Sequence, residues 1–384
     1  MPSAIVVGAG LAGLNCARTL QENGFDVIVL EKSDRVGGRV KTDYVEGFQF
    51  DHGFQVINPA YSEISRLKNN AELDLRALPK GFEIEIADKN YLVGDPRYSL
   101  KFLPDDFSKE TGSLSEKLAF LWFLLRKPGD HTLGQAMRRS GNFYTQILKG
   151  FLDGVFLTDS NQVSTTMARE LLLWFVRGNP GVPAKGVAEL PRLLSRTLDI
   201  RLNCEVNEIR QGTLQTNQGV FQADSVVVAA DPKATVHLLQ RPQISMNSSW
   251  TWYHCVDSQA LQSKFLKVLH NGALLNSVAI SNVAPDYAPH GTTLISSSTL
   301  HDLTEKDATT AVSRAWKLNP SDLRYLSRYE IRDSLPFHAP GKPLYSPQRI
   351  SEHVIVAGDG FAIPAQQGAL RSGRVAAENV IAGQ

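Results

Sequence analysis

The sequence predicts an α/β protein of two domains, one of which is assembled from separated parts of the chain. Short apolar runs, too brief for helices, occur near its start, middle and end, at residues 4–7, 226–230 and 354–357. Runs rich in Val, Ile and Ala are typical of parallel strands that are buried on both faces. The stretches between them have a different, helical or alternating pattern. A discontinuous domain therefore explains the pattern better than domains arranged in series.

The composition is that of an ordinary globular protein and excludes several classes. The chain has 384 residues, and 40 Lys and Arg against 39 Asp and Glu give a net charge of +1, which provides no electrostatic reason for a nucleic-acid partner. Cys16, Cys204 and Cys255 are far apart, so we expect no disulfide framework, no metal site and a reducing, cytoplasmic location. Among the histidines, we expect His52 and His254 to be packed, hydrogen-bonded residues. No apolar run approaches the ~20 residues of a membrane span, and we expect no signal peptide.

The first β-α-β unit carries a dinucleotide-binding fingerprint. A strand at 4–7 leads into Gly8-x-Gly10-x-x-Gly13 and a helix, and a second strand at 25–30 ends on Glu31. Gly8 permits the tight turn, Gly10 lets the backbone approach a pyrophosphate, and Gly13 lets the helix lie close to the strand. The helix start offers N–H groups to phosphates, while Glu31 can accept hydrogen bonds from ribose hydroxyls. The sequence therefore predicts a Rossmann-type domain.

The remaining elements follow in a simple order. Helical segments are expected at 61–178 with a hairpin at 82–92, short strands at 200–230, more strands at 250–299, a helix at 306–326, a strand at 354–357 and a small-residue helix at 364–381. We therefore assign residues 1–60, 185–240 and 350–384 to the Rossmann-type domain. Residues 61–184 and 241–349 are assigned to a mixed α+β domain for the substrate.

A second glycine-rich stretch indicates what the chain resembles. Arg35-x-Gly37-Gly38-Arg39 comes just after Glu31, and such a run can bring backbone amides and a guanidinium against a pyrophosphate. With residues 47–55, it resembles the flavin-containing amine oxidoreductase superfamily, which includes monoamine oxidases, protoporphyrinogen oxidase, phytoene desaturases and renalase-like proteins. Later segments, at 204–209, 224–230, 357–360 and 366–373, are also similar to that superfamily.

The resemblance implies a Rossmann-type FAD-binding domain. It implies that the Val206 backbone meets the adenine and that Asp359 binds the ribityl chain or pyrophosphate. It also implies that Gly368 and Ala369 place a helix N-terminus under the flavin O2 edge, where reduced flavin gathers negative charge. No cysteine follows Ala357, so we expect FAD to be bound non-covalently. The candidate cofactor-binding residues are Gly8, Gly10, Leu11, Ala12, Gly13, Glu31, Lys32, Gly37, Gly38, Arg39, Gly53, Phe54, Gln55, Val206, Gly358, Asp359, Gln367, Gly368 and Ala369.

Only one complete fingerprint occurs, because Gly358-Asp359-Gly360 lacks a third glycine. A second nucleotide domain for NAD(P)H is therefore not expected. We expect the substrate to donate a hydride to flavin N5, and O2, a quinone or another diffusible acceptor to remove the electrons. Residues 150–157 and 333–336 resemble phytoene-desaturase-related members most. The sequence thus favours desaturase-like dehydrogenation of a hydrophobic small molecule.

Two alternatives stay open. An O2-using oxidase of the amine-oxidase, protoporphyrinogen-oxidase-like or renalase-like type would place an aromatic pair and a lysine near the flavin. Phe337 and Tyr345 lie in the right region without a recognisable cage, and Lys264, Lys267 and Lys342 are equivalent candidates. The second alternative is a flavin-bound isomerase or a non-catalytic binding protein. The sequence assigns no catalytic side chain.

Residues 117–127 allow two interpretations. Leu118 to Leu125 form an apolar run that contains Trp122 and is flanked by Lys117 and Arg126-Lys127. Such a segment can lie in a membrane surface, with residues 171–176 beside it, and draw a lipophilic substrate from the bilayer. A helix that is apolar all round is more often buried in a core. The core is the favoured interpretation, and peripheral membrane contact through 117–127 is the alternative.

Overall fold

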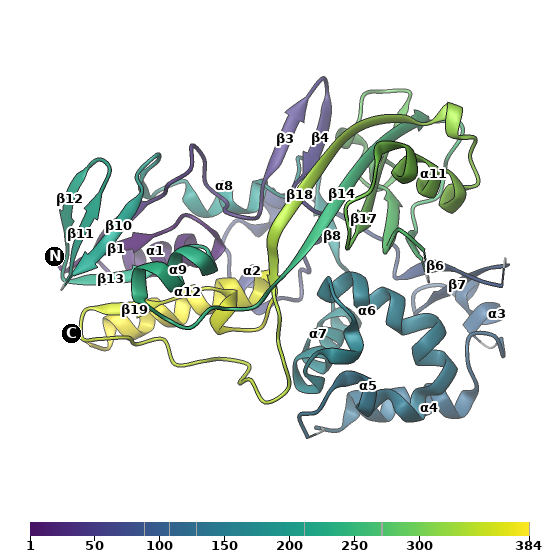
Figure 1. Cartoon of the computed structure of the whole chain (residues 1–384), viewed down its shortest axis with the longest axis horizontal. Coiled ribbons are helices and arrows are strands. Elements are labelled where there is room, and N and C mark those ends of the chain that lie inside the picture. Colours follow the sequence, from purple (N-terminus) through teal and green to yellow (C-terminus); the bar gives the residue numbers. More distant parts are fainter. Residues whose placement is uncertain (88, 107, 128, 211, 270–271, 384) are drawn as a thin grey trace.

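The computed structural model describes residues 1–87, 89–106, 108–127, 129–210, 212–269 and 272–383, and Figure 1 shows their arrangement. A five-stranded sheet has the order β19-β13-β1-β2-β9, and every neighbouring pair is parallel. Its strands are β1 (Ser3–Val7), β2 (Asp26–Leu30), β9 (Asp199–Arg201), β13 (Ser225–Val228) and β19 (Val354–Val356). All five come from the three segments assigned to the Rossmann-type domain. Distant parts of the chain thus meet in one sheet.

This sheet is covered on both faces. Successive side chains of β1 point to opposite faces of the sheet. Val6 belongs to a core with the helices, whereas Ile5 and Val7 belong to a second core with Val206 and Leu214. One face carries α1 (Leu11–Glu22), α8 (Glu189–Ser195) and α12 (Gln366–Ile381). The other faces β10 (Val206–Arg210), β11 (Thr213–Thr216) and β12 (Gly219–Gln222), and α9 (Pro232–Leu239) contributes Leu238 and Leu239 to the same core.

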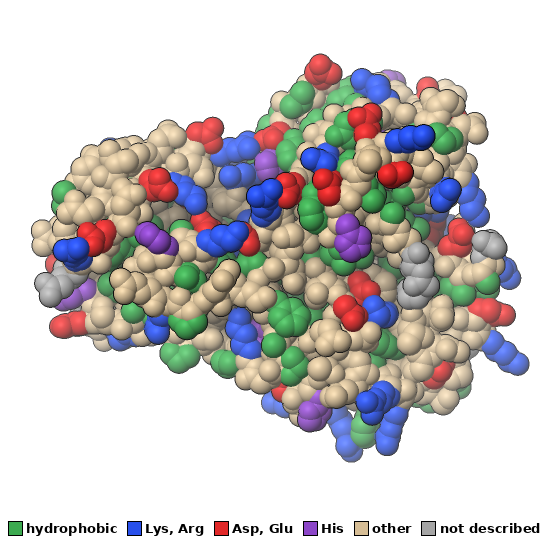
Figure 2. Space-filling view, viewed as in Figure 1, with side chains coloured by type: hydrophobic (Ala, Val, Ile, Leu, Met, Phe, Trp, Pro, Cys, Tyr) green, Lys and Arg blue, Asp and Glu red, His purple; other side chains and the backbone are tan. Residues whose placement is uncertain are grey.

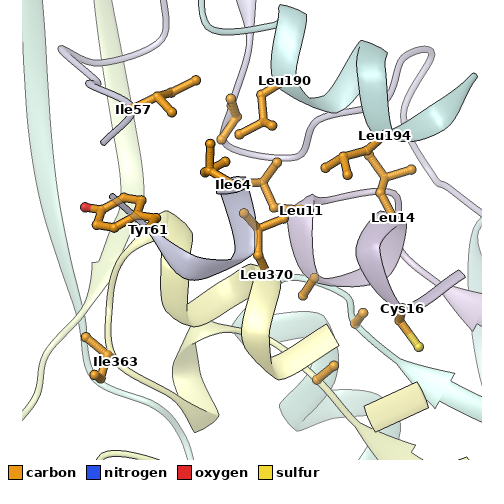
Figure 3. Close-up of a cluster of buried hydrophobic side chains, with 14 of the residues drawn as sticks. Leu11, Leu14, Cys16, Ile57, Tyr61, Ile64, Leu190, Leu194, Ile363 and Leu370 are labelled. Atoms are coloured by element: carbon orange, nitrogen blue, oxygen red, sulfur yellow. The ribbon is translucent and has the colours of Figure 1, made fainter. Parts of the chain in front are cut away.

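The helical side of this sheet is a continuous apolar cluster. Figure 3 shows Leu11 and Leu14 of α1 meeting Leu190 and Leu194 of α8, with Leu370 of α12 nearby. All five side chains are at most 6% exposed. The cluster therefore fixes the starts of α1 and α12 relative to each other, and these two helix starts border the site described below.

A second, seven-stranded sheet has the order β18-β14-β17-β16-β15-β6-β7. It is antiparallel except that β15 and β6 are parallel. The long strands β14 and β18 run from the first sheet's side of the molecule into this one (Figure 1). Helix α11 (Glu305–Trp316) covers one face. The strands are β6 (Gly81–Ile86), β7 (Lys89–Gly94), β14 (Met246–Asp257), β15 (Leu266–Val268), β16 (Asn276–Ala279), β17 (Thr292–Thr299) and β18 (Arg324–Pro336).

Helices lie below the second sheet in the view of Figure 1. They are α4 (Leu114–Leu125), α5 (Leu133–Ala136), the 3-10 helix η3 (Met137–Ser140), the π-helix η4 (Phe143–Leu148), α6 (Lys149–Phe156) and α7 (Thr165–Arg177). The shorter elements include α2 (Ser62–Ser65), α3 (Leu103–Asp106), α10 (Ile280–Val283), the pair β3 (Thr42–Val45) and β4 (Phe48–Asp51), and the pair β5 (Leu75–Ala77) and β8 (Gly181–Pro183).

Two expectations from the sequence are wrong. The helix expected at 306–326 ends at Trp316, because Lys317 adopts a left-handed conformation (φ 53°) and Pro320 follows. The segment at 117–127 is not all core, since one face of α4 is open to solvent while Phe123 and Leu124 are buried. Nowhere in the described ranges is a helix long and apolar enough to cross a bilayer.

Candidate cofactor and substrate site

The turn between β1 and α1 brings three glycines to one end of a large cavity. Gly8 has a φ of 102°, and a Cβ there would lie 2.6 Å from the carbonyl oxygen of Ala229. A Cβ at Gly13 would lie 1.9 Å from the oxygen of Gly8, so only glycine allows this approach of α1. A Cβ at Gly10 would meet no atom within 4 Å, and Gly10 borders the cavity. The N-cap residue Gly10 has no side chain to cap α1, so an anionic group above Gly10 can reach the first N–H groups of the helix.

Glu31 is fixed at the end of β2. Its side chain is 6% exposed, and its two carboxylate oxygens accept hydrogen bonds from the N–H groups of Ala9 (2.7 Å) and Ser33 (2.8 Å). Each oxygen retains capacity to accept another hydrogen bond, as ribose hydroxyls require. Next to it, Lys32 Nζ pairs with Asp231 Oδ2 at 2.7 Å. Glu31, Lys32 and Asp231 all border the cavity.

The second glycine run lies directly against the first. Gly37 and Gly38 have φ values of 116° and 61°, which favour glycine. The Gly37 N–H donates to the carbonyl of Ala9 at 2.8 Å, and a Cβ at Gly38 would lie 3.3 Å from the Cα of Gly10. The two runs therefore form one backbone surface without side chains, against which a phosphate group can lie.

Arg39 connects this surface to the closing segment of the chain. Its guanidinium donates to Asp359 Oδ1 at 2.5 Å and to the carbonyl of Ser334 at 2.9 Å. Asp359 is 5% exposed, and the preceding N–H, of Gly358, donates to Ser372 Oγ at 3.0 Å. Because Arg39 and Asp359 both border the cavity, a donor and an acceptor of opposite charge lie side by side at its wall.

The start of α12 reaches the same wall. A Cβ at Gly373 would lie 2.0 Å from the carbonyl oxygen of Ala12, so α12 packs directly on α1. Ala369 borders the cavity. The Gln367 side chain turns away, because its Oε1 accepts from the N–H of Glu63 at 3.1 Å and its Nε2 donates to Ser62 at 2.7 Å.

All but three of the candidate cofactor-binding residues line one cavity of about 780 Å³. The three exceptions, Gly13, Gln367 and Gly368, lie behind its wall. The residues present fit FAD: a glycine surface that any Cβ would obstruct, a fixed carboxylate for a ribose, and an arginine for a pyrophosphate. The candidates that line the cavity are Gly8, Gly10, Leu11, Ala12, Glu31, Lys32, Gly37, Gly38, Arg39, Gly53, Phe54, Gln55, Val206, Gly358, Asp359 and Ala369.

Several polar residues of this lining are not among the candidates predicted from the sequence, including Ser33, Glu205, Asp231 and Ser334. Asp231 could have been found, since it follows the strand at 226–230. The carboxyl ends of parallel strands meet at the edge where ligands bind. Ser334 lies on β18, far along the sequence, and does not follow a predicted parallel strand, so no comparable pattern marked it.

The cavity continues onto one face of the second sheet. Thr251, Ser298, Asn276 and Val268 are opposite one another on four adjacent strands and form a row across its wall. The helical region also lines the cavity, through Phe120 on α4, Phe151 on α6 and Phe175 on α7. This part of the cavity we call the apolar chamber. Besides Thr251, Asn276 and Ser298, it is lined by Leu78, Phe82, Phe120, Leu148, Phe151, Val155, Leu157, Leu171, Leu172, Phe175, Val176, Leu266 and Val268.

None of the three candidate lysines lines the cavity. Leu266 and Val268 face it, so Lys267 between them points to the opposite side of the sheet, where its Nζ pairs with Glu83 at 2.9 Å and lies 4.8 Å from the Trp316 ring centre. Lys264 is exposed. Lys342 borders a second, smaller cavity of about 480 Å³.

The expected aromatic pair is also elsewhere. Phe337 borders the smaller cavity, and the Arg371 guanidinium lies 3.5 Å from the ring centre of Tyr345. Neither ring lines the large cavity. The amine-guiding arrangement that the sequence analysis considered is therefore not formed by these residues.

The two histidines differ in position. His254 is fully buried with its Nε2 at 3.0 Å from the Thr309 hydroxyl, and burial lowers its pKa to about 4. It is a packed residue, as expected. His52 borders the cavity, and its Nε2 lies 2.9 Å from Asp43 Oδ2. Burial raises the pKa of Asp43, but hydrogen bonds from His52, Arg35 and Tyr329 outweigh it and hold that pKa at about 2.

Comparisons with known proteins agree with this geometry. A family model described as flavin containing amine oxidoreductase matches residues 11–381. Two curated relatives are polyamine oxidase 3 of Oryza sativa subsp. japonica and polyamine oxidase 2 of Arabidopsis thaliana. Each is 30% identical over 260 residues, which cover 59% of this chain and 51% and 50% of those proteins. The chain thus spans about half the length of these relatives.

Solved structures share the fold over nearly the whole chain. An oxidoreductase from Methanosarcina mazei has a TM-score of 0.79 at 15% identity, covering 99% of this chain and 100% of that one. A putrescine oxidase double mutant gives 0.76 at 15% identity, with the same shares covered. Reduced UDP-galactopyranose mutase gives 0.72 at 13% identity, covering 100% and 96%. At these identities the likeness concerns the fold alone.

Proposed function

The chain belongs to the flavin-containing amine oxidoreductase family and binds FAD, and we propose that it dehydrogenates an apolar small molecule in the chamber beside the cofactor. FAD held there would supply an acceptor, its N5 atom, for a hydride from a substrate C–H. The chain's own contribution is to hold the cofactor through the two glycine runs, Glu31 and Arg39. Its second contribution is to exclude water from an apolar substrate.

The aromatic lining of the apolar chamber carries this proposal. The rings of Phe82 and Phe151 are stacked with centres 5.3 Å apart, and Phe175 meets Phe151 edge-on at 5.5 Å. Such a wall favours a flat or branched hydrocarbon, because apolar area removed from water contributes about 25 cal/mol per Å². Thr251, Asn276 and Ser298 offer neutral hydrogen bonds that would orient one polar group of the substrate.

The charges near the chamber argue against a polyamine. Of the described residues on this side of the cavity, Asp95 supplies the carboxylate, and it accepts hydrogen bonds from the Arg97 guanidinium at 2.5 to 3.0 Å. Lys80 is cationic and lies 3.6 Å from the ring centre of Tyr98. A polycation would therefore find no free anionic partner there and would lose hydration without compensation.

The polyamine oxidase relatives favour the alternative of an O2-using amine oxidase. The shared fold of UDP-galactopyranose mutase keeps a flavin-bound isomerase as a further alternative. The three candidates differ in what reduces the flavin and what reoxidises it. An oxidase predicts fast reoxidation by O2 with hydrogen peroxide as product, and an isomerase predicts no net flavin reduction.

The test is anaerobic mixing of the FAD-loaded protein with a panel of donors while the oxidised flavin band is followed. The panel contains apolar polyenes and alicyclic compounds on one side, and spermidine, putrescine and a monoamine on the other. Bleaching by an apolar member, with reoxidation by a quinone faster than by O2, is the expected result. Bleaching by the polyamines alone would reject the proposed substrate class and leave the family assignment intact.

A further inference from the structure

Helix α4 presents an apolar stripe to solvent. Leu114, Leu118, Leu121, Trp122 and Leu125 are 65%, 56%, 50%, 49% and 73% exposed. At 100° per residue these five positions fall within an arc of about 100°, so they form one continuous face. The other described exposed large hydrophobics are dispersed over other elements. A stripe of this kind on one helix marks an interaction surface.

The opposite face of α4 is packed and holds the stripe in place. Phe123 and Leu124 are 7% and 8% exposed and belong to the main core. Ser113 and Glu116 form a reciprocal capping box at the helix start. The stripe is therefore a fixed feature of a stably packed helix.

Basic side chains lie at the end of α4 and on the element packed against it. Arg126 and Lys127 follow the end of α4, and Arg138 and Arg139 lie on η3, which packs against α4. All four are exposed, and within the described part of the chain none forms an ion pair with a carboxylate. The Arg126 guanidinium lies 3.8 Å from the Trp122 ring centre. Figure 2 shows Lys and Arg side chains gathered along the lower edge of the molecule, where α4 and α5 lie in Figure 1.

We propose that this face docks the protein on a lipid bilayer that contains anionic phospholipids. The apolar stripe would enter the interfacial region while the basic side chains meet the lipid phosphates. Trp122 and Arg126 are residue types that favour the boundary between water and acyl chains, because each combines an apolar part with a polar end. Positive charge around the stripe favours an anionic lipid surface over a second copy, which would bring the same charges together.

The docked face also lies close to the apolar chamber. Phe120 of α4 lines the chamber, whereas Leu121 and Trp122 next to it lie on the stripe. On α7, Val176 lines the chamber and is itself 42% exposed. A lipophilic substrate could thus pass from the bilayer into the chamber over a short apolar path. This last step rests on the proposed function, while the docking itself does not.

The test is co-sedimentation of the full FAD-loaded protein with vesicles of phosphatidylcholine alone and of phosphatidylcholine mixed with phosphatidylglycerol. We expect binding to the mixed vesicles that weakens at high salt, and weaker binding to phosphatidylcholine. The double variant Trp122→Asp/Leu125→Asp should partition at least about tenfold less. Arg138→Glu/Arg139→Glu should lose the preference for phosphatidylglycerol.

Matched controls separate the stripe from general effects. Val45→Asp/Val220→Asp introduces the same charge at exposed apolar residues of β3 and β12 (50% and 62% exposed) and should bind as the unchanged protein does. Flavin content and photoreduction are recorded for every variant, so failed docking is distinguishable from a failed oxidoreductase. Equal sedimentation of the α4 double variant, or none of the unchanged protein, would overturn the proposal. A dimer in solution that this double variant dissociates would also overturn it and assign the face to a second copy.

Discussion

Glu31 is the residue on which the proposed cofactor site depends most directly. Its carboxylate is held by the Ala9 and Ser33 N–H groups, so its position is set before any ligand arrives. We expect Glu31→Ala to lose charge-assisted contacts worth about 1.5–3 kcal/mol, which corresponds to roughly 10- to 150-fold weaker FAD binding. Titration of the apoprotein with FAD measures this. Glu22→Ala, at an exposed ion pair with Arg18, is the control, and an unchanged affinity of Glu31→Ala would remove Glu31 from the site.

Asp51 makes a pH-dependent contribution to stability. Burial raises its pKa to about 6, even though it accepts hydrogen bonds from Thr42, Tyr287 and the Val187 N–H. Its pKa in the unfolded chain is about 3.9. A raised pKa stabilises the fold below the unfolded value, and this stabilisation is lost as the pH rises through about 6.

Asp51→Asn should therefore remove a pH dependence worth at most about 3 kcal/mol. Urea unfolding at about pH 4.5 and about pH 7 gives the comparison. The unchanged protein should lose more stability than the variant between these two pH values. Identical losses in both proteins would contradict the raised pKa.

At the scale of elements, the start of α1 offers a matched pair of variants. Gly13→Ala would place a Cβ 1.9 Å from the oxygen of Gly8 and force α1 off β1, at a cost of about 1–3 kcal/mol. Gly10→Ala meets no protein atom within 4 Å and has an ordinary φ of −76°, so the fold should lose about 1 kcal/mol or less.

The two variants separate an effect on the stability of the fold from an effect on FAD binding. Gly10→Ala should nevertheless bind FAD at least tenfold more weakly, since its methyl group would enter the cavity (a loss of about 1.4 kcal/mol). Thermal unfolding of the apoproteins and FAD titration give the two readings. Normal FAD affinity in Gly10→Ala would show that the backbone there does not approach the cofactor.

Local patterns predicted the elements that we propose to hold the cofactor. The apolar run at 4–7, the glycine fingerprint and Glu31 lie within about thirty residues of one another and are predictable from them, because turn geometry and strand burial are local. The orientation of the candidate lysines could not be predicted in this way. Whether Lys267 or its neighbours face the cavity depends on strand register in a seven-stranded sheet, which contacts distant in sequence determine.

Which face of helix α4 is buried could not be predicted from the local sequence, for a similar reason. Every residue from Leu118 to Leu125 is apolar, so periodicity did not distinguish an inner from an outer face. The distinction arises because Phe123 and Leu124 pack into the main core and no described element covers Leu121 or Trp122. That is a property of the assembled helices, not of the segment.

At the scale of the whole molecule, one cavity joins two sheets that were built from interleaved parts of the chain. The parallel sheet supplies the glycine surfaces and carboxylates, and the mixed sheet with the helices supplies the apolar chamber. We propose that these correspond to the two domains assigned from the sequence. The chamber was the part least accessible to sequence analysis, since its wall combines β6, β14 to β17, α4, α6 and α7.

The measurement that tests the central claim most directly is identification of the cofactor in the purified protein. We expect an oxidised flavin spectrum with one FAD for each chain, released intact when the protein is unfolded in acid because no covalent bond holds it. A folded protein that carries no flavin and takes up none from added FAD would contradict the account. FAD that stays attached to the unfolded chain would contradict the non-covalent site.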